Sequence, residues 1–582
     1  MRIGLLTEGG YPYVSGEAGL WCDRLVRGLG QHEFDVYALS RSECQDAEGW
    51  VPLPPQVSRV RTAPLWDAGD DGVVHGRRAR RRFAEYYGEL VAALSTAAPG
   101  DSFGASAETS ALEADRFASA LYGLAELARD EGGLPGALRS DTAVRALERA
   151  CRAPGAHRSA REARVPDLLT VAARLERALR PLSLDWYEDD GLGAVDLCHA
   201  ASGGTAALPG LLARHFFDVP LLVTEYGVRL RTHYLTEPDS PPAIRSLLAA
   251  FHGRLAAETY RRAAVITPGN THARRWQERC GADRAKLRTV YPGMDAAPFA
   301  EAGEAGEAGQ LGAAGESPQG AGPRTLVWVG RVEPAKDLVS LLHAFAEIRK
   351  AEPGARLRIV GTPGGPEGAA YHVHCKGLAA QLFPDEADGP HAVGRNPVSF
   401  EETGGPELPS RADAYASGAL VVLSSVVEGF PAGLVEAMLC GRATVSTDVG
   451  AVVEVIGGTG LVVPPRNPRA LAEACVALLR DPERRERLGA AARARALELF
   501  TVEQNVAAFH GIYLDILSRT PVHRVVLDDT GEPLPFAVPA EARVSGRWTD
   551  PPARVVARGG PGWATDAPAR APISLPATEG AR

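Results

Sequence analysis

Two glutamates eight positions apart are the first residues in this sequence whose spacing suggests chemistry. Glu428 and Glu436 lie in SSVVEGFPAGLVEAMLCG, which begins at Ser424. The apolar run ALVVLSS predicts a buried strand, and PAGLVEAMLCG predicts a helix with Pro431 at its start and Gly441 just past its end. We therefore expect Glu428 in a strand-to-helix turn and Glu436 on the helix. Ligands of open α/β sheets bind at this edge of the sheet.

Two positive charges follow another predicted strand. The segment VGRVEPAKD places Arg331 and Lys336 directly after the apolar run TLVWV. In a parallel sheet, these cations would meet the Glu428 turn and the backbone N–H groups near Gly433 and Leu434 at one edge. Cations beside a helix N-terminus suit a diphosphate, and carboxylates accept hydrogen bonds from sugar hydroxyls. The pattern predicts a diphosphate site flanked by acceptors for sugar hydroxyls.

Alternating strand and helix patterns in both halves of the chain indicate an α/β fold. Such alternation predicts two doubly wound parallel sheets with helices on both faces, which face each other across a cleft. The Gly/Ala/Glu-rich stretch between the halves indicates a flexible linker, and the Pro/Arg/Ala-rich end indicates disorder. The expected boundaries are 1–299 for the first domain, about 77–182 for a helical insertion in it, 300–323 for the linker, 324–500 for the second domain, 501–519 for a helix packing back on the first domain and 520–582 for a mostly disordered tail.

Composition describes a soluble globular protein. The chain has 582 residues, of which 45% are hydrophobic and 23% charged, with a net charge of -9. This charge argues against general nucleic-acid binding. No apolar run is long enough to span a membrane, and the start MRIGLLTEGGYPYVSGE lacks the apolar core of a signal peptide. The eight cysteines are scattered without a C-x-x-C pair, which favours reduced thiols and a cytoplasmic location.

Other polar residues leave two interpretations open. Asp448 could face the cleft or cap the next turn, and Arg231 could bind donor phosphate or acceptor or be solvated. His199 ends a predicted strand and fits a structural histidine better than an acceptor ligand. The YHVHC segment lacks a fourth metal ligand at suitable spacing. The sequence has neither a D-x-D pair nor a P-loop, so a metal–diphosphate handle and an NTPase are not expected.

The motifs taken together resemble a known enzyme family. The G-R-x4-K pattern is Gly330, Arg331 and Lys336, and the E-x7-E pattern is Glu428 and Glu436. With TDVGAVVEVI and GLVVPPRNPRALAEA, they resemble the donor-binding domain of family-four retaining glycosyltransferases, which have the GT-B fold. The first half, with LLTEGGYPYVSG and LLVTEYGVRLR, resembles the Pel-polysaccharide-type branch. The resemblance covers roughly residues 1–70 and 185–518.

This resemblance implies a role for each site residue. Arg331 and Lys336 would hold the donor diphosphate, Glu436 would bind the nucleotide ribose, and Glu428 would contact the transferred sugar. The expected catalytic residues are Glu428, Arg331 and Lys336. The expected donor-binding residues are Gly16, Gly330, Arg331, Lys336, Glu428, Gly433, Leu434 and Glu436, of which Gly16 would let the first loop approach the phosphates. Tyr226 and Arg231 are expected near the sugar or the acceptor.

The resemblance implies a metal-independent retaining transfer of a hexose from a nucleotide diphosphate sugar, with a UDP-sugar favoured, to a hydroxyl acceptor. It implies no resident cofactor, and a role in exopolysaccharide or glycoconjugate synthesis. The expected partners are the nucleotide sugar, a carbohydrate or other hydroxyl acceptor and no nucleic acid; peripheral association with a membrane synthesis complex is also considered.

Two departures from the family pattern keep alternatives open. Tyr226 stands where the family has a histidine near the sugar, and Glu17 stands where it has the second of two glycines. A tyrosine still donates a hydrogen bond but stays neutral at pH 7, and a carboxylate beside a diphosphate repels it. These residues favour a catalytically degenerate GT-B protein that binds sugar nucleotides or acts as a scaffold. A sugar-nucleotide epimerase of the same fold is a third interpretation.

Overall fold

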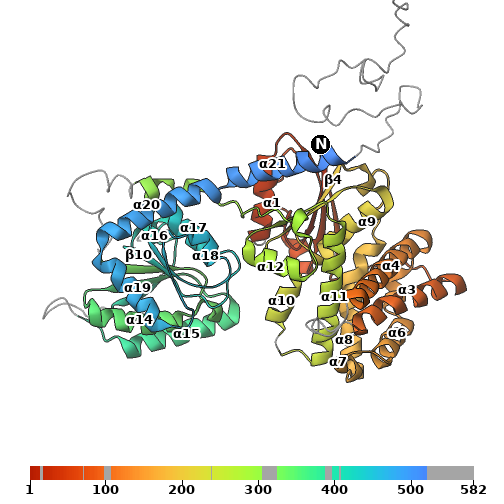
Figure 1. The fold of residues 1–582 in the computed structure, drawn as a ribbon, viewed down its shortest axis with the longest axis horizontal. Helices are drawn as coiled ribbons and strands as arrows, with labels where there is room; N and C mark the ends of the chain where they lie inside the picture. Colours follow the sequence, from red (N-terminus) through yellow and green to blue (C-terminus); the bar gives the residue numbers. More distant parts are fainter. Residues whose placement is uncertain are drawn as a thin grey trace, which may run out of the picture.

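Two parallel sheets of six strands form the two halves of the chain (Figure 1). The computed structural model describes residues 1–13, 17–67, 69, 71–96, 107–237, 239–304, 324–386, 396–405 and 408–520. The strand order is β3-β2-β1-β4-β5-β6 in the first sheet and β12-β11-β10-β7-β8-β9 in the second. Each order reverses direction beside its first strand, as in doubly wound folds. The predicted fold class, two doubly wound α/β domains, is confirmed.

The strands are short apolar runs, as expected for parallel strands that helices cover on both faces. The first sheet contains β1 Arg2–Glu8, β2 Glu33–Ser40, β3 Val57–Pro64, β4 Leu197–Ala200, β5 Leu221–Glu225 and β6 Val265–Pro268. The second sheet contains β7 Thr325–Val329, β8 Arg356–Val360, β9 Val398–Glu401, β10 Leu420–Leu423, β11 Thr444–Thr447 and β12 Leu461–Val463.

The helices follow the strands in alternation. Those before β7 are α1 Glu17–Gly28, α2 Glu43–Glu48, α3 Arg77–Thr96, α4 Ala107–Glu131, α5 Leu134–Leu138, α6 Asp141–Arg152, α7 Arg158–Arg161, α8 Val165–Leu179, α9 Leu208–Phe217, α10 Arg229–Thr236, α11 Pro242–Arg262 and α12 Thr271–Arg279. Those after β7 are α14 Leu338–Ala351, α15 Gly365–Leu382, α16 Arg411–Ala416, α17 Ala432–Leu439, α18 Val452–Ile456, α19 Pro468–Arg480, α20 Pro482–Leu499 and α21 Val502–Arg519. Short 3-10 turns include η1 Arg180–Ser183 and η6 Pro334–Lys336.

Helices α1 and α21 cover one face of the first sheet. Buried side chains of Trp21 on α1 and of Phe509 and Tyr513 on α21 share one apolar cluster with the strands. The Trp21 indole N–H also donates to Asn505 Oδ1 at 3.2 Å. Figure 1 shows α20 in the lobe of the second sheet and α21 reaching the lobe of the first. The last described helix therefore links the two domains.

The opposite face of the first sheet carries α9, α11 and the helices between β3 and β4. Helices α3, α4, α6 and α8 share one buried apolar cluster with α11 and the sheet. The Tyr122 hydroxyl of α4 donates to Glu258 Oε1 of α11 at 2.7 Å, and Glu258 is 3% exposed. These helices occupy the stretch where a helical insertion is predicted, and they thicken one side of the first domain.

The segment between the two sheets is only partly described. Residues 300–304 have helical backbone, and Ala302 packs against the buried cluster of α16, α17, α18 and α20. The rest of the predicted linker, 305–323, lies outside the described residues, as does the predicted tail beyond Thr520. Among the helices that the structure describes, none has the length and apolar character needed to cross a membrane.

Candidate active site

Glu428 lies in the turn that joins β10 to α17. Its Oε1 atom accepts a hydrogen bond from Ser425 Oγ at 2.9 Å and forms an ion pair with Lys336 Nζ. Gly450 passes close to this turn with a positive φ of 57°, and a Cβ there would lie 2.4 Å from the Glu428 carbonyl oxygen. Only glycine fits such a combination of φ and contact. The loop after β11 therefore helps to fix the Glu428 backbone.

Lys336 lies in the loop after the neighbouring strand β7, at the end of the 3-10 turn η6. The Ser424 hydroxyl donates to the Lys336 carbonyl at 2.7 Å, and the Val426 N–H donates to the Ala335 carbonyl at 2.9 Å. These bonds join the loops after β7 and β10, which are adjacent in the sheet. The sequence separates Lys336 and Glu428 by 92 positions, and the topology brings them into contact.

A cavity of about 350 Å³ opens at this edge of the second sheet. Its lining combines cations, small residues of the α17 start and the ends of β7 and β8. The lining residues are Trp328, Val329, Gly330, Arg331, Lys336, Val360, Gly361, Thr362, Thr403, Arg411, Leu423, Glu428, Phe430, Pro431, Ala432 and Gly433. The expected residues Gly330, Arg331, Lys336, Glu428 and Gly433 thus line one cavity.

Arg331 and Lys336 differ in their surroundings. Arg331 is exposed and forms no ion pair with any residue that the structure describes, whereas Lys336 is half-buried and paired with Glu428. A phosphate could therefore reach Arg331 without breaking an existing ion pair. Binding at Lys336 would compete with its carboxylate partner, because one ammonium would serve two anions.

The start of α17 supplies backbone donors beside these cations. Pro431 is the N-cap, and Gly433 is the second helical residue, so its N–H precedes the intrahelical hydrogen bonds. A Cβ at Gly433 would lie 3.2 Å from the Tyr415 hydroxyl, so a larger residue there would crowd this side chain. The Leu434 N–H instead donates to the Pro431 carbonyl at 3.0 Å, and the Leu434 side chain is buried. Leu434 therefore belongs to the turn and the core, behind the cavity.

Glu436 lies on α17 with its side chain only 8% exposed. Its Oε2 atom accepts from the Tyr415 hydroxyl at 2.8 Å and pairs with Arg411 Nη2 at 2.7 Å. Burial, followed by the nearby Glu436 charge, raises the pKa of Tyr415, which therefore stays a neutral donor. Glu436 does not itself line the cavity, but its partner Arg411 does. The structure thus separates the two glutamates into a cavity residue and a supporting residue.

The sequence did not indicate Arg411 as part of the site. It lies at the start of α16, after Ser410, whose side chain accepts from the Asp413 N–H at 3.2 Å while Asp413 bonds back to the Ser410 N–H. A capping box of this kind is a sequence signal for a helix start. It gives no hint that Arg411 reaches Glu436, because that contact depends on the order of the strands.

Two predicted residues come from the first domain. Arg231 Nη2 donates to the Glu428 carbonyl oxygen at 3.3 Å, so the first domain touches the turn of the second. Burial lowers the pKa of the Arg231 guanidinium. Tyr226 packs edge-on against Trp21 with 5.3 Å between ring centroids, and Asn505 Nδ2 donates to its hydroxyl at 3.4 Å. Arg231 is therefore near Glu428, whereas Tyr226 is held by α1 and α21.

Gly16, Glu17 and His199 are the other residues of the first domain for which the sequence suggested a role. Gly16 lies outside the described residues, and Glu17 begins the backbone of α1. His199 is fully buried, between the Tyr513 hydroxyl and Thr224 Oγ1, each at 2.7 Å, as a structural histidine would be. Within the described residues, no group of three or more His, Cys, Asp or Glu side chains could hold a metal ion.

Family models match both halves of the chain. Residues 323–481 match the model described as "Glycosyl transferases group 1". Residues 1–285 match a model described as a domain of unknown function, DUF3492. The model that matches the second half thus covers β7 to α19, including every residue that lines the cavity.

Curated relatives carry a glycosyltransferase name. A "D-inositol 3-phosphate glycosyltransferase" of Kineococcus radiotolerans is 32% identical over 306 residues, which cover 49% of this chain and 64% of that protein. A protein of the same name from Streptomyces bingchenggensis is 28% identical over 321 residues, covering 53% of this chain and 64% of that protein. The match therefore spans less than two thirds of the length of these relatives.

Solved structures share the whole arrangement of two domains. A sucrose-phosphate synthase from Thermosynechococcus elongatus has a TM-score of 0.51 and 17% identity, covering 89% of this chain and 100% of that one. Anabaena HepE in complex with UDP has a TM-score of 0.50 and 15% identity, covering 88% and 100%. At identities this low, the similarity shows only a shared fold. That fold is the predicted GT-B fold. The chain thus has the GT-B fold, and its residues 323–481 match the model of glycosyl transferases group 1.

Proposed function

We propose that this protein is a retaining hexosyltransferase that moves a sugar from a nucleotide diphosphate donor, a UDP-sugar, to a hydroxyl acceptor. The observation that carries the proposal is the cavity of the second domain. It joins Arg331, Lys336, Glu428 and the first turn of α17 at the carboxyl ends of β7 and β10. Two cations and helix N–H groups around one concave site match the charge of a diphosphate.

The same groups would stabilise the leaving group. When the bond from sugar to phosphate breaks, negative charge grows on the departing phosphate. Arg331 and Lys336 are positioned to receive this charge. The backbone N–H groups at the start of α17 are fixed before the reaction, and fixed donors stabilise such charge most effectively. Lys336 would exchange its Glu428 partner for the phosphate. Glu428 could then accept hydrogen bonds from the transferred sugar, which lies beside the phosphate in any donor of this class.

Glu436 would act further along the donor, at the ribose. Its carboxylate is oriented by Tyr415 and Arg411, and Arg411 also lines the cavity. A ribose diol needs an acceptor held in place, and the Tyr415 hydroxyl would hold the Glu436 carboxylate when Arg411 moves. On approach of the nucleotide, Arg411 would turn toward the ligand and leave Glu436 available.

We further propose that transfer needs no resident cofactor or metal, and that the acceptor hydroxyl attacks from the same face that the phosphate leaves. The departing phosphate would take the acceptor proton. Support comes from the resemblance to the Pel-polysaccharide-type branch of retaining family-four enzymes. An exopolysaccharide or glycoconjugate would be the product, and contact with a membrane synthesis complex would be peripheral.

Calorimetric titration with UDP, GDP and ADP tests the donor site first. The proposal expects UDP to bind most tightly and Arg331→Ala to weaken it by about 1.5–3 kcal/mol, the value of a hydrogen bond to a charged group. Incubation with UDP-sugars then tests transfer, with and without EDTA, and proton NMR of the product gives the anomeric configuration. No binding of any nucleotide, or an inverted product, would refute the proposal.

A binding protein without turnover is the second candidate. The observation that favours it is Tyr226, whose ring and hydroxyl are engaged by Trp21 and Asn505. UDP binding without transfer from any UDP-sugar, in the presence of a range of hydroxyl acceptors, would support this second candidate over the first.

A further inference from the structure

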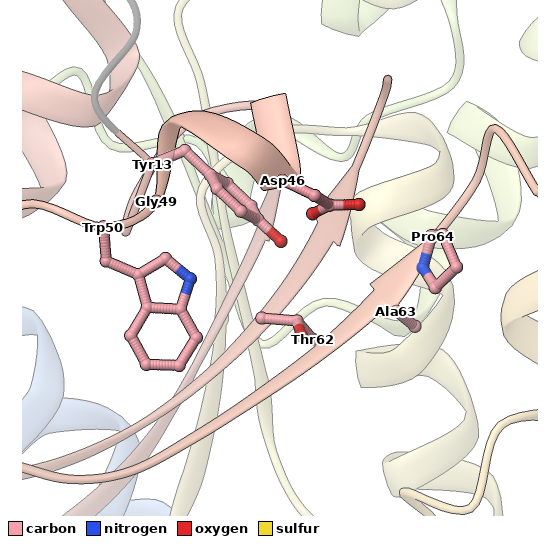
Figure 2. Close-up of a pocket in the computed structure, with 7 residues that line it drawn as sticks. All are labelled: Tyr13, Asp46, Gly49, Trp50, Thr62, Ala63 and Pro64. Carbon is pink, nitrogen blue, oxygen red and sulfur yellow. The ribbon is translucent and has the colours of Figure 1, made fainter. Parts of the chain in front are cut away.

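A second cavity, of about 450 Å³, lies at the carboxyl edge of the first sheet. It is lined by Tyr13, Asp46, Gly49, Trp50, Thr62, Ala63 and Pro64. Thr62, Ala63 and Pro64 form the end of β3, Asp46 lies on α2, and Tyr13 follows β1. Figure 2 shows the Tyr13 hydroxyl pointing toward the space between Asp46 and Thr62, with the Trp50 indole to one side. The cavity belongs to neither the diphosphate site nor the packing of the two domains.

The walls of this second cavity are held in place by several contacts. Tyr13 and Trp50 pair as an antiparallel bridge, and the Val51 N–H donates to the Pro12 carbonyl at 2.9 Å. Asp46 Oδ2 accepts from Ser40 Oγ at 2.8 Å and from the Trp66 indole N–H at 2.7 Å. Two hydrogen bonds to one oxygen fix the carboxylate and leave it the acceptor capacity of Oδ1.

An exposed tryptophan gives the cavity an unusual wall. Trp50 is 48% exposed, although large aromatic side chains are normally covered. Tyr13 is 2% exposed, and its hydroxyl makes no hydrogen bond of ordinary geometry within the described residues, although Asp46, Ser40 and Thr62 surround it. The Tyr13 oxygen is almost inaccessible to solvent, so Tyr13 shapes the wall of the cavity behind Asp46 and Thr62.

The chemistry of these walls fits a neutral sugar ring. A pyranose has an apolar C–H face, which can pack on an indole, and hydroxyl groups around its edge. Trp50 offers the apolar face, while the Asp46 carboxylate and the Thr62 hydroxyl offer acceptors and a donor at the opposite side. Asp46 is the charged residue of the lining and repels phosphate, sulfate or a uronic acid.

The position of the cavity assigns it to the acceptor and not to the donor. It lies beside β3, whereas Arg231, which contacts Glu428, follows β5. Three strands, β2, β1 and β4, separate β3 from β5 in the sheet. Neighbouring strands lie about 4.8 Å apart, so the two places are roughly 19 Å apart along the same edge. Only a ligand several sugar residues long could occupy both.

We infer that the Trp50–Asp46 cavity is a remote subsite for an uncharged oligosaccharide acceptor, which binds a sugar residue distant from the hydroxyl that reacts. The inference rests on the proposed function for its link to catalysis, but sugar binding at this cavity can be measured without turnover. It predicts that the chain favours longer acceptors over shorter ones and neutral acceptors over acidic ones.

The test is a titration of the full chain with neutral gluco-oligosaccharides of increasing length and with uronic-acid oligosaccharides of matched length, followed by intrinsic tryptophan fluorescence. We expect the neutral series to bind more tightly as it lengthens, and the acidic series to bind at least tenfold more weakly. Trp50→Ala should weaken the longest neutral ligand about tenfold, and Trp50→Phe should restore most of the affinity, since stacked aromatic contacts contribute at this level.

Two further variants keep the test decisive. Val373→Ala, on the exposed face of α15 in the second domain, is the matched control and should bind like the parent. Thr62→Tyr fills the cavity from an exposed strand position that tolerates an aromatic residue, and it should block binding even if Trp50→Ala fails to fold. Equal affinity for acidic and neutral ligands, parent-like binding by Thr62→Tyr, or no oligosaccharide binding at all would overturn the inference. In those cases UDP titration still decides the proposed function separately.

Discussion

At the residue scale, the ion pair between Lys336 and Glu428 sets the competition inside the donor site. Lys336 Nζ is held by the Glu428 carboxylate, which also accepts from Ser425. Replacing Glu428 with Gln removes the negative charge but keeps the hydrogen-bonding shape. We expect Glu428→Gln to bind UDP as the parent does or up to about tenfold more tightly, because Lys336 no longer has to leave an ionic partner. Turnover should fall, since the transferred sugar loses its carboxylate.

Glu436→Gln should behave in the opposite way. Its carboxylate is buried beside Arg411 and Tyr415, so the ribose would lose a charged acceptor and UDP affinity should drop by about 1.5–3 kcal/mol. Calorimetric titration of both variants with UDP makes the comparison, with Glu473→Gln on the exposed face of α19 as the control. Equal losses of UDP affinity in both variants would contradict the division of roles.

The sequence predicted the positions of these residues better than the contacts that support them. Residue type and spacing were enough to place Glu428 in the turn, Glu436 on the helix and Lys336 after β7, because local patterns decide these positions. The contacts of Arg411 with Glu436 and of Arg231 with Glu428 join residues from different strands and domains. No local pattern encodes such contacts, so they became visible only with the order of the strands.

At the element scale, the crossing of α1 and α21 depends on one glycine. A Cβ at Gly28 would lie 2.5 Å from Val506 Cγ2, closer than atoms in contact can approach. Gly28→Ala should therefore lower the free energy of unfolding by about 1–3 kcal/mol, as overpacked positions do. Gly88→Ala on α3 is the matched control, because no heavy atom lies within 4 Å of its Cβ, and it should gain about 1 kcal/mol of helix propensity.

Denaturant midpoints of the two glycine variants and of the double variant Gly28→Ala, Val506→Ala test this crossing. The double variant should recover part of the loss, since the shortened side chain makes room for the new methyl group. A Gly28→Ala midpoint equal to that of the parent would show that α21 can shift away from α1 without cost.

Beneath α21, strand β4 of the first sheet carries a buried histidine, His199, whose titration should be measurable. Burial lowers the pKa of His199 to about 3, well below its ordinary 6.5. Between pH 6.5 and pH 3 the unfolded chain therefore binds a proton at His199 that the folded chain does not bind. The contribution of neutral His199 to the free energy of unfolding is fully present above pH 6.5 and is lost as the pH falls. This residue should cost about 1.4 kcal/mol of stability per pH unit in that window.

Urea unfolding at pH 7 and pH 5, for the parent and for His199→Gln, checks the sign and the size of this effect. Glutamine keeps partners for Tyr513 and Thr224 but cannot take up a proton. His252 and His32 also have lowered pKa values, of about 3 and about 4, and they remain in both proteins. Between pH 7 and pH 5, the free energy of unfolding should fall by about 2 kcal/mol less in the variant than in the parent. An identical pH dependence would mean that His199 does not stay neutral in the fold.

Helices and strands could be predicted where the sequence repeats a simple apolar pattern. Features that depend on the packing of segments distant in the sequence could not. The apolar runs of β1, β7 and β10 and the helix after Pro431 follow from periodicity alone. The exposed Trp50 carried no such signal, because its environment combines α2, the end of β3 and the loop after β1. A cavity at a sheet edge depends on three segments that meet only in the fold.

At the scale of the whole molecule, two contacts join the domains beside the donor site. Arg231 of α10 reaches the Glu428 carbonyl. Glu454 of α18 accepts from the Thr271 N–H at the start of α12 at 2.7 Å and from the Tyr291 hydroxyl at 2.9 Å, and it also bonds the Thr271 hydroxyl. Glu454 thus completes the N-terminal turn of a helix in the other domain, where a negative charge is favourable.

This contact makes the separation of the two domains sensitive to one side chain. Glu454→Ala removes the three hydrogen bonds that Glu454 makes with Thr271 and Tyr291 while leaving the residues of the donor cavity unchanged. We expect the radius of gyration from solution scattering to increase in the absence of ligand, because inter-domain contacts within a chain are weak enough for relative motion once a link is lost. The matched control is Glu473→Ala, whose exposed carboxylate pairs only within α19 among the described residues.

The functional consequence should divide between binding and turnover. Apart from Gly16, the expected donor-binding residues all lie in the second domain, so the affinity of Glu454→Ala for UDP should stay within about twofold of the parent. Transfer needs Arg231 and the acceptor side of the first domain close to Glu428. Turnover should therefore fall by about tenfold, which corresponds to a loss of about 1.4 kcal/mol in the free energy that favours the aligned arrangement of the domains. An unchanged radius of gyration together with parent-like turnover would show that Glu454 does not control the domain arrangement. A parallel loss of UDP affinity would instead place part of the donor site on the first domain.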